Sequence, residues 1–410
     1  MKFTNEDSLY NYIAELMIYS NIDFVACPII SPWHAIGVDA LVYDISQHKR
    51  EKPSGIVVIT PHLRGKFTIN EETFACRDFA NMQFCYLDST SKDKELTMSG
   101  QIHLAKTAFN ILLAIKRLRQ TKKDSRQQMH IITAMFPNVF VLQAFKNKTL
   151  ASKYYPIFSL VDEGIGTCMP EKSWRTASEL TSPNNMPRYF QLTRFLRVKM
   201  MYNASNVLKL IGGKGLAIQK WFLLKNNHDK LTINEQYITL YKKALAQKAG
   251  IHKKRNKERP TAMIITTYWR YDDTPLAGEL DLMEGIINIL IESGFSVVIK
   301  PHPTEPANKY GYILSMHKQV NLAPQEVLAE VLFARLKPDC VIGYDSSALL
   351  YANVIYNIPT IRITDMLLSK LDAEAIDASW ELFKKLTKGT LYNANSFEEL
   401  KVILPSCTHD

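Results

Sequence analysis

The 410-residue sequence lacks the marks of several classes of protein. No apolar run approaches the ~20 residues that a membrane-spanning helix requires. The first residues, MKFTNEDSLYNYIAEL, have no apolar core of the kind found in signal peptides. The six cysteines are scattered without CxxC spacing, which indicates reduced thiols. We therefore expect a cytoplasmic protein that is at most peripheral to a membrane.

Sequence signatures of metal sites, P-loops and serine hydrolases are also missing. The sequence contains no HExxH, no zinc-ligand spacing and no GxSxG. The glycines of Ile211–Gly215 lie in a basic helical pattern without a preceding strand, which argues against a P-loop. Asp272 and Asp273 form a lone acidic pair, which is weak evidence for a divalent metal. We expect an activity that needs neither a metal nor a cofactor.

The sequence has a surplus of positive charge. Fifty Lys and Arg against forty Asp and Glu give a net charge of +10 at pH 7. The hydrophobic share of 46% and the charged share of 22% are those of an ordinary soluble globular protein. The surplus favours an anionic partner: nucleic acid, an anionic membrane face, or acidic sugars and nucleotides. Because no RRM, KH or helix-turn-helix signature accompanies the basic residues, we do not expect nucleic acid.

Short β-rich apolar runs alternate with helical patterns, which predicts α/β domains with mostly parallel sheets and helices on both faces. The predicted strands are Ile22–Cys27, Gly55–Thr60, Met82–Leu87, His130–Ala134, Ile157–Val161, Ala262–Thr266, Phe295–Ile299, Cys340–Tyr344 and Thr360–Ile363. The predicted helices include Ser99–Leu118, Asn138–Lys146, Gly278–Glu292, Gln325–Leu336 and Ser347–Tyr356. We predict Rossmann-like domains at 1–172 and 261–410, joined by a basic helical connection at 173–260.

Polar clusters follow several predicted strands, at the sheet edge where open α/β domains bind ligands. Ser346 and Ser347 open a helix, so they either cap it or seat a phosphate at its N-terminus. His302 lies between two prolines that restrict the backbone. It is either a turn residue or a group that neutralises a phosphate or donates a proton. Thr266 and Thr267 end a further strand of the same half of the chain.

An acidic cluster, Asp162-Glu163-Gly164, follows the predicted strand Ile157–Val161. Adjacent side chains of an extended chain face opposite ways, so only one of the two carboxylates should line a cleft. That carboxylate can act as a general base on a hydroxyl. The alternative is an acidic turn with a glycine bend. Because the clusters come from both halves of the chain, they predict a site shared between two domains.

Taken in order, these motifs resemble those of bacterial sialyltransferases, including the polysialyltransferases of capsule synthesis. Those families carry a D/E-D/E-G, an HP and an S-S/T motif, which stand here as Asp162-Glu163-Gly164, His302-Pro303 and Ser346-Ser347. The run Cys27-Pro28-Ile29-Ile30-Ser31-Pro32-Trp33-His34 also looks like the strand–Ser-Pro–helix start of related enzymes. The resemblance spans about residues 20–365 of the 410.

The resemblance implies a GT-B fold, in which two Rossmann-like domains face each other across a cleft, and a CMP-activated sialic acid donor. It implies that Glu163 is the general base and that His302 is the general acid or the phosphate partner. Ser346 and Ser347 would bind the CMP phosphate with the help of Thr266 or Thr267. Further expected substrate-binding residues are Asp162, Gly164, Pro303, Ser31, Trp33 and His34.

From this resemblance we expect inverting, metal-independent transfer of sialic acid to a hydroxyl of a capsule, O-antigen or lipooligosaccharide glycan. The acceptor is expected to be lipid-linked or polyanionic, with the basic region Arg188–Arg259 in contact with it. One alternative is a transferase of another CMP-activated keto-sugar acid, such as Kdo, because the HP and serine motifs do not distinguish these donors. The other is a non-catalytic protein that binds nucleic acid through its charge.

Overall fold

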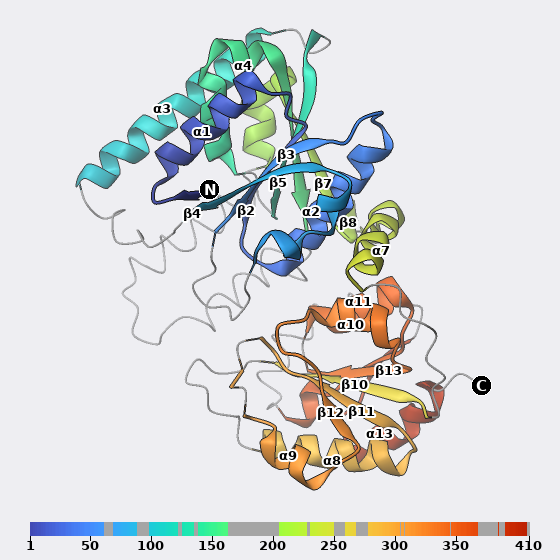
Figure 1. Ribbon diagram of the computed structural model, residues 1–410. Coiled ribbons are helices and arrows are strands. Elements are labelled where there is room, and N and C mark those ends of the chain that lie inside the picture. The colour runs from blue at the N-terminus through green and yellow to red at the C-terminus, as the bar shows by residue number, and fades with distance from the viewer. Residues whose placement is uncertain are drawn as a thin grey trace.

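The structure of the protein is a computed structural model. It describes residues 1–60, 69–87, 98–121, 125–134, 138–162, 205–227, 230–249, 259–267, 278–303, 305–306, 308–344, 346–367, 384 and 390–407. Two parallel sheets, one in each half of the chain, form the framework of the molecule (Figure 1).

The N-terminal sheet has, within the described residues, seven parallel strands in the order β1-β4-β3-β2-β5-β6-β7. They are β1 (Lys2–Phe3), β2 (Phe24–Ile29), β3 (Ser54–Ile59), β4 (Asn81–Leu87), β5 (Gln127–Ala134), β6 (Tyr154–Val161) and β7 (Ala217–Trp221). Every residue of β6 is buried, as expected for a strand that is covered on both faces. The chain adds strands outward from β2 to one edge and from β5 to the other, so the order reverses between β2 and β5.

The C-terminal sheet has six parallel strands in the described part of the chain, in the order β12-β11-β10-β13-β14-β15. They are β10 (Thr261–Ile265), β11 (Ser296–Lys300), β12 (Val320–Leu322), β13 (Cys340–Gly343), β14 (Thr360–Arg362) and β15 (Leu391–Asn393). The chain first runs outward from β10 to β12 and then from β13 to β15, so the order reverses between β10 and β13. Such a reversal marks the place where open α/β sheets bind ligands.

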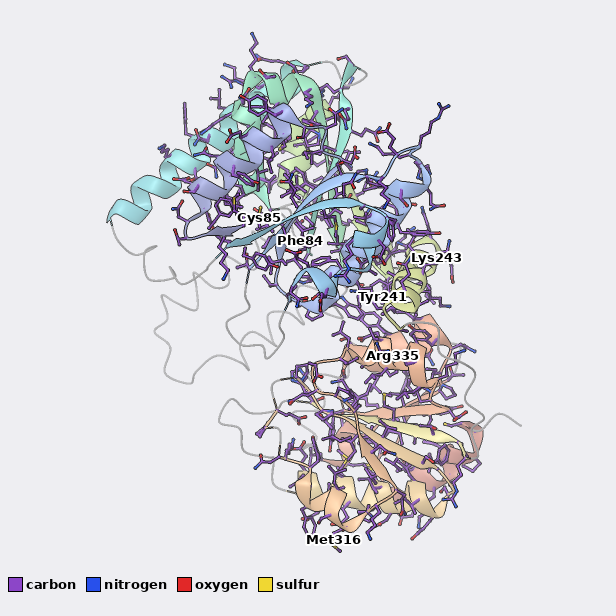
Figure 2. The ribbon with its side chains drawn as sticks, in the orientation of Figure 1. Phe84, Cys85, Tyr241, Lys243, Met316 and Arg335 are labelled. Atoms are coloured by element: carbon purple, nitrogen blue, oxygen red, sulfur yellow. The ribbon has the colours of Figure 1, made fainter. Side chains whose placement is uncertain are left out.

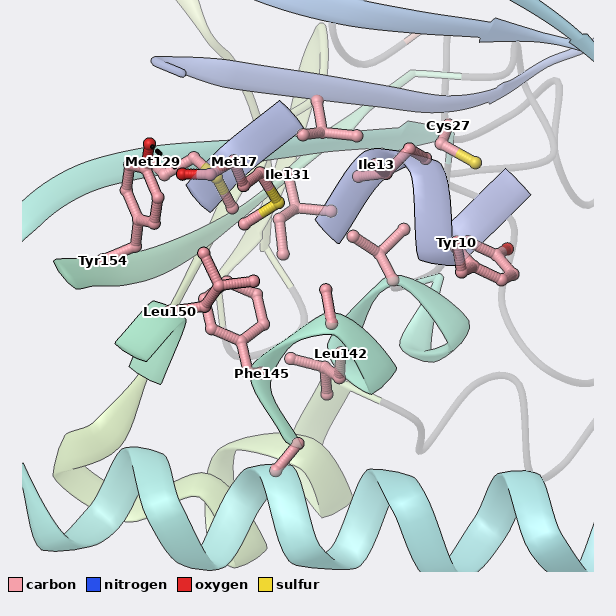
Figure 3. Close-up of a cluster of buried hydrophobic side chains, with 14 of the residues drawn as sticks. Tyr10, Ile13, Met17, Cys27, Met129, Ile131, Leu142, Phe145, Leu150 and Tyr154 are labelled. Atoms are coloured by element: carbon pink, nitrogen blue, oxygen red, sulfur yellow. Dashed lines mark hydrogen bonds between the residues drawn. The ribbon is translucent and has the colours of Figure 1, made fainter. Parts of the chain in front are cut away.

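Helices cover both faces of the N-terminal sheet. One face carries α1 (Glu6–Tyr19), α3 (Met98–Gln120), the 3₁₀ segment η5 (Val139–Lys146) and α4 (Lys148–Lys153). Figure 3 shows the apolar core on this side, where Met17 of α1 and Phe145 of η5 pack toward Ile131 of β5. The other face is covered by α2 (Pro32–Gln47) with the 3₁₀ segments η1 (Glu71–Thr73) and η2 (Ala75–Asp78).

The C-terminal sheet is covered in the same way. One face carries α8 (Glu279–Glu292), α9 (Gly311–Met316), α13 (Phe397–Ile403) and the 3₁₀ segment η9 (Leu404–Cys407). The other carries α10 (Ala329–Leu336) and α11 (Ser347–Tyr356). Alternate residues of β10 face the two layers: Met263 packs with α10 and α11, whereas Ile264 packs with α8. The remaining elements are η7 (Gly213–Gly215), η8 (Thr364–Met366) and an antiparallel hairpin of β8 (Leu224–Asn227) and β9 (Lys230–Ile233).

Helix α7 (Glu235–Ala249) lies between the two domains. It packs against α2 of the N-terminal domain and against α10 of the C-terminal domain. Its buried residues Tyr237, Tyr241 and Leu245 belong to the same apolar cluster as Ile36 of α2 and Phe333 of α10. Figure 2 shows Tyr241 in the region where the two domains meet. The two Rossmann-like domains therefore share a continuous apolar interface, and the GT-B-like architecture predicted from the sequence is confirmed.

Most predicted elements agree with the structure to within a few residues, and α11 agrees at both ends. Three predictions need correction. The helix predicted at Asn138–Lys146 is a 3₁₀ segment over Val139–Lys146, and the helix predicted from Gln325 begins only at Ala329. Residues 217–221, which lie in the expected helical connection, instead form β7 and pair with β6 at the edge of the N-terminal sheet. Among the residues that the structure describes, no helix is both long and apolar enough to cross a membrane.

Candidate active site

Three polar segments meet at the carboxyl edge of the C-terminal sheet, around its point of strand-order reversal. Thr266 follows β10, His302 follows the neighbouring strand β11, and Ser346 follows β13 on the other side of β10. Gly343, the last residue of β13, allows a close approach to β10, because a Cβ atom there would lie 2.7 Å from the Ile265 carbonyl oxygen. The structure therefore brings the sequence-predicted residues of the C-terminal domain to one edge of one sheet.

Ser346 is the N-cap of α11. Its side-chain oxygen accepts a hydrogen bond from the backbone N–H of Ala348 at 3.3 Å, so the capping interpretation holds for this serine. Ser347 is the first helical residue, and its hydroxyl has no hydrogen-bond partner among the described residues. Both serines are half-buried, and the first N–H groups of a helix and its dipole favour an anion at this end.

The two threonines after β10 have different surroundings. Thr266 is buried, and its hydroxyl accepts a hydrogen bond from the backbone N–H of His302 at 2.9 Å. Thr267 is half-buried, and its hydroxyl oxygen is inaccessible to solvent and has no hydrogen-bond partner within the described part of the chain. Thr266 therefore supports the loop that carries His302, whereas the buried Thr267 hydroxyl makes no hydrogen bond in the described part of the chain.

The His302 backbone is held by hydrogen bonds in addition to its flanking prolines. Its N–H also lies 2.8 Å from Oε2 of Glu305, and its carbonyl accepts a hydrogen bond from Nε2 of Gln325 at 2.8 Å. Burial lowers the pKa of the half-buried imidazole below its usual value, while the Glu305 carboxylate opposes this shift. The ammonium groups of Lys300 and Lys309 lower the pKa further.

Lys300, the last residue of β11, points into the protein and is 3% exposed. Its ammonium donates to the carbonyl oxygens of Pro301 at 2.5 Å and of Gln325 at 3.2 Å. Burial lowers its pKa to about 8, although the nearby carboxylates of Glu330 and Glu305 oppose the shift. Lys300 thus holds the start of the His302 loop, at Pro301, to the segment that contains Gln325.

The acidic motif is described only as far as Asp162, and Glu163 and Gly164 lie outside the described residues. Asp162 follows β6 and is 1% exposed. Its Oδ2 accepts a hydrogen bond from the Leu223 backbone N–H at 3.0 Å and from the Tyr351 hydroxyl of α11 at 3.4 Å. This carboxylate therefore lies in the interface between the two domains.

The Ser31–His34 segment starts α2 and reaches the same interface. Ser31 is the N-cap of α2, and His34 is buried with Nδ1 3.4 Å from the Ile30 backbone N–H. Trp33 stacks on Tyr351, with ring centroids 4.8 Å apart and an interplanar angle of 20°. A Cβ atom at Gly37 would lie 2.8 Å from Cβ of Val161, so this glycine lets α2 pack closely on β6.

Four residues that the sequence analysis missed form a buried charged network behind His302. Glu305 contacts Thr266, Lys309 and Tyr310, and Lys309 also pairs with Glu279 of α8 at 2.6 Å. The one local signal was the glutamate three residues after the histidine in His302-Pro303-Thr304-Glu305. Lys309 and Tyr310 follow Glu305 by four and five residues, whereas Glu279 comes from α8, 26 residues before Glu305, and no spacing in the sequence links it to the others.

A cavity of about 710 Å³ also lies between the domains, bounded by η1, η2, the end of α7, and α10 with the segment before it. Arg335 of α10, labelled in Figure 2, lines it. None of the sequence-predicted site residues that the structure describes lines it. Among the described residues, no group of His, Cys, Asp or Glu side chains is placed to hold a metal ion.

The model of the alpha-2,8-polysialyltransferase (POLYST) family matches residues 28–364. No curated protein gives a significant match. The fold is similar to an alpha/beta-galactoside alpha-2,3-sialyltransferase from Photobacterium phosphoreum, with 12% identity, a TM-score of 0.48, and coverage of 93% of this chain and 100% of the other.

Two further solved structures show weaker similarity. The gt-b domain of a sialyltransferase from Photobacterium damselae has 16% identity and a TM-score of 0.40, covering 90% of this chain and 100% of the other. A UDP-GlcNAc 2-epimerase from Methanocaldococcus jannaschii has 13% identity and a TM-score of 0.42, covering 94% and 99%.

Proposed function

The chain belongs to the alpha-2,8-polysialyltransferase family and is a sialyltransferase, and from this premise we propose that it transfers sialic acid from CMP-sialic acid to a glycan hydroxyl with inversion. The observation that carries the proposal is the arrangement at the strand-order reversal. Thr267, His302 and Ser346 follow three neighbouring strands of one sheet, at the edge where such sheets bind nucleotides.

The leaving group is CMP, so negative charge develops on its phosphate as the glycosidic bond breaks. In the proposal, the N-terminus of α11 at Ser346 and Ser347 receives the phosphate, because its free N–H groups and helix dipole stabilise an anion. His302 donates a proton or a hydrogen bond to the departing phosphate oxygen. Stabilisation by such preorganised donors is usually the largest single contribution to catalysis.

The general base in the proposal is Glu163. Its neighbour Asp162 is occupied by two hydrogen bonds in the domain interface. Since Asp162 is engaged in the domain interface, we take Glu163 as the carboxylate of the motif that serves the acceptor. Glu163 would remove the proton from the acceptor hydroxyl on the face of the sugar opposite to CMP, which gives inversion at the anomeric carbon.

The proposed acceptor is a sialic-acid-ended glycan of the cell surface. The family name supports an α-2,8 linkage, which places the reacting hydroxyl on a sialic acid. Such an acceptor is anionic, and the net charge of +10 complements it. The basic residues of 188–259 would hold the acceptor, lipid-linked or polymeric, and bring the protein to the anionic inner face of the membrane.

Product analysis by mass spectrometry tests the proposal. The purified protein is incubated with CMP-sialic acid or CMP-Kdo and with acceptors that end in galactose or in sialic acid. The proposal predicts a mass increase of one or more sialic acid residues on the sialic-acid-ended acceptor with CMP-sialic acid. Transfer from CMP-Kdo but not from CMP-sialic acid would show that the donor is CMP-Kdo. Transfer only to the galactose-ended acceptor would show that the acceptor ends in galactose.

A further inference from the structure

We propose that Glu305 is a positioning residue for this reaction, which fixes the His302 loop and the Thr266 hydroxyl against each other at the nucleotide edge of the sheet. The inference rests on the proposed function, since it assumes that His302 acts on the leaving phosphate. It concerns a residue that does not itself touch the substrate.

The geometry around Glu305 shows what it holds. Oε2 contacts the His302 backbone N–H at 2.8 Å and the Thr266 hydroxyl. Oε1 accepts from the Lys309 ammonium at 2.7 Å and from the Tyr310 hydroxyl at 3.0 Å. One carboxylate thus ties the end of β10 to the segment after β11 on one side. On its other side it is anchored to the region that precedes α9.

Only a carboxylate satisfies this set of contacts. Each oxygen faces two donor groups, and an ionised carboxylate is an acceptor at both oxygens. A glutamine at position 305 has the same shape, but its NH₂ would face either the His302 N–H or the Lys309 ammonium, which are themselves donors. Charge-assisted hydrogen bonds of this kind are also about twice as strong as neutral ones.

The burial of the network gives it rigidity. Glu305, Glu279 and Tyr310 are each 1% exposed, and the Lys309 side chain is 6% exposed. Buried charges are costly unless they are paired, so removing Glu305 leaves Lys309 with a single carboxylate partner, Glu279. The loop that carries His302 therefore has one defined position, which is what a proton donor to a bound phosphate requires.

Glu305 also affects the charge of His302. Burial lowers the pKa of the imidazole and the Glu305 carboxylate raises it, so neutralising Glu305 lowers that pKa further. The protonated imidazole would then be lost at a lower pH. In the variant, the alkaline limb of the kcat profile should move to lower pH.

Glu305→Gln tests the inference, with Glu279→Gln as the matched control. Both changes remove one buried carboxylate that pairs with Lys309, but only Glu305 contacts His302 and Thr266. We expect Glu305→Gln to lower kcat by about 10- to 100-fold, since a misplacement of about 1 Å can cost about 10²-fold. We expect it to move the alkaline limb to lower pH and to leave the KM for the acceptor unchanged.

The Glu279→Gln control should lower the melting temperature but keep the pH profile and kcat within about twofold of wild type. Two results would show that Glu305 only stabilises the fold. One is an equal loss of kcat in the two variants, and the other is a folded Glu305→Gln protein whose kcat–pH profile has the same alkaline limb as wild type. Glu305→Asp keeps the charge, so it should keep the wild-type pH limb while lowering kcat.

Hydrogen–deuterium exchange of the wild-type protein gives a second test of the inference. The His302 backbone amide should exchange with deuterium much more slowly than an unprotected loop amide, because it is bonded to a buried carboxylate. Exchange at the unprotected rate would overturn the inference. Wild-type turnover with CMP-sialic acid decides the proposed function separately: an inactive wild type refutes that function, whereas an active wild type with an unaffected Glu305→Gln refutes only the role of Glu305.

Discussion

The Tyr351 hydroxyl of α11 donates a hydrogen bond to Oδ2 of Asp162 at 3.4 Å, across the boundary between the two domains. Tyr351 lies on the helix that begins at Ser347, and Asp162 lies one residue before Glu163. The same tyrosine ring stacks on Trp33 at the start of α2. The acidic motif proposed to act on the acceptor and the serine motif proposed to bind CMP are therefore connected through the Tyr351 side chain.

Changing Tyr351 to Phe should weaken this connection without changing the shape of the ring. The free energy of unfolding should fall by about 1 kcal/mol, the typical net contribution of one hydrogen bond. Urea denaturation measures the change. The control is Tyr392→Phe, because the Tyr392 hydroxyl has no hydrogen-bond partner in the described part of the chain. A loss in the control equal to that in Tyr351→Phe would contradict the prediction.

Glu163→Gln should remove the general base while keeping the side-chain shape. We expect turnover to fall by about 10²-fold or more, the usual span of general acid–base catalysis, while the affinity for CMP barely changes. Steady-state kinetics and calorimetric titration with CMP measure the two effects. The matched variant is Asp162→Asn at the adjacent carboxylate. If Glu163→Gln keeps near wild-type turnover and Asp162→Asn does not, Asp162 is the base; if both stay active, the mechanism is wrong.

His302→Ala should lower both turnover and CMP affinity, because the proposed imidazole contact is with the phosphate itself. This result would differ from that of Glu163→Gln, which should affect the chemical step alone. The same kinetic and titration measurements apply. A folded His302→Ala protein that binds CMP as tightly as wild type would remove the histidine from the phosphate site.

Turnover should survive saturating EDTA. The N-terminus of α11 and His302 can supply the positive character that a metal ion would otherwise provide at the phosphate. The measurement is the initial rate of sialic acid transfer before and after chelation. Activity that is lost with EDTA and restored by Mg²⁺ or Mn²⁺ would refute the prediction.

Reversing exposed positive charges in the 188–259 region should weaken acceptor binding more than donor binding. A suitable triple variant is Lys209→Glu, Lys220→Glu and Lys242→Glu, whose side chains are all exposed. The KM for a polyanionic acceptor should rise, and more strongly at low salt, where screening is weaker. The control reverses the exposed lysines Lys318 and Lys401 of the C-terminal domain. Equal loss of donor and acceptor binding in a folded variant would contradict the assignment.

The alternation of strands and helices around the three motifs, and the positions of those motifs, were determined by the sequence alone. Apolar periodicity and turn residues act between near neighbours in the chain, so the ends of α11 and the strand before it could be predicted closely. The serine after β13 was recognised as a cap or an anion seat for the same local reason.

Tertiary structure decided which of these segments touch. The bond between Asp162 and Tyr351 joins positions 189 residues apart, and the bond between Thr266 and Glu305 joins positions 39 apart. Local sequence patterns do not predict contacts between residues so far apart in the chain, because these contacts depend on the strand order and on the packing of helices between sheets. The addition of β7 to the N-terminal sheet and the burial of Glu305, Lys309 and Glu279 in one charged network followed only from that packing.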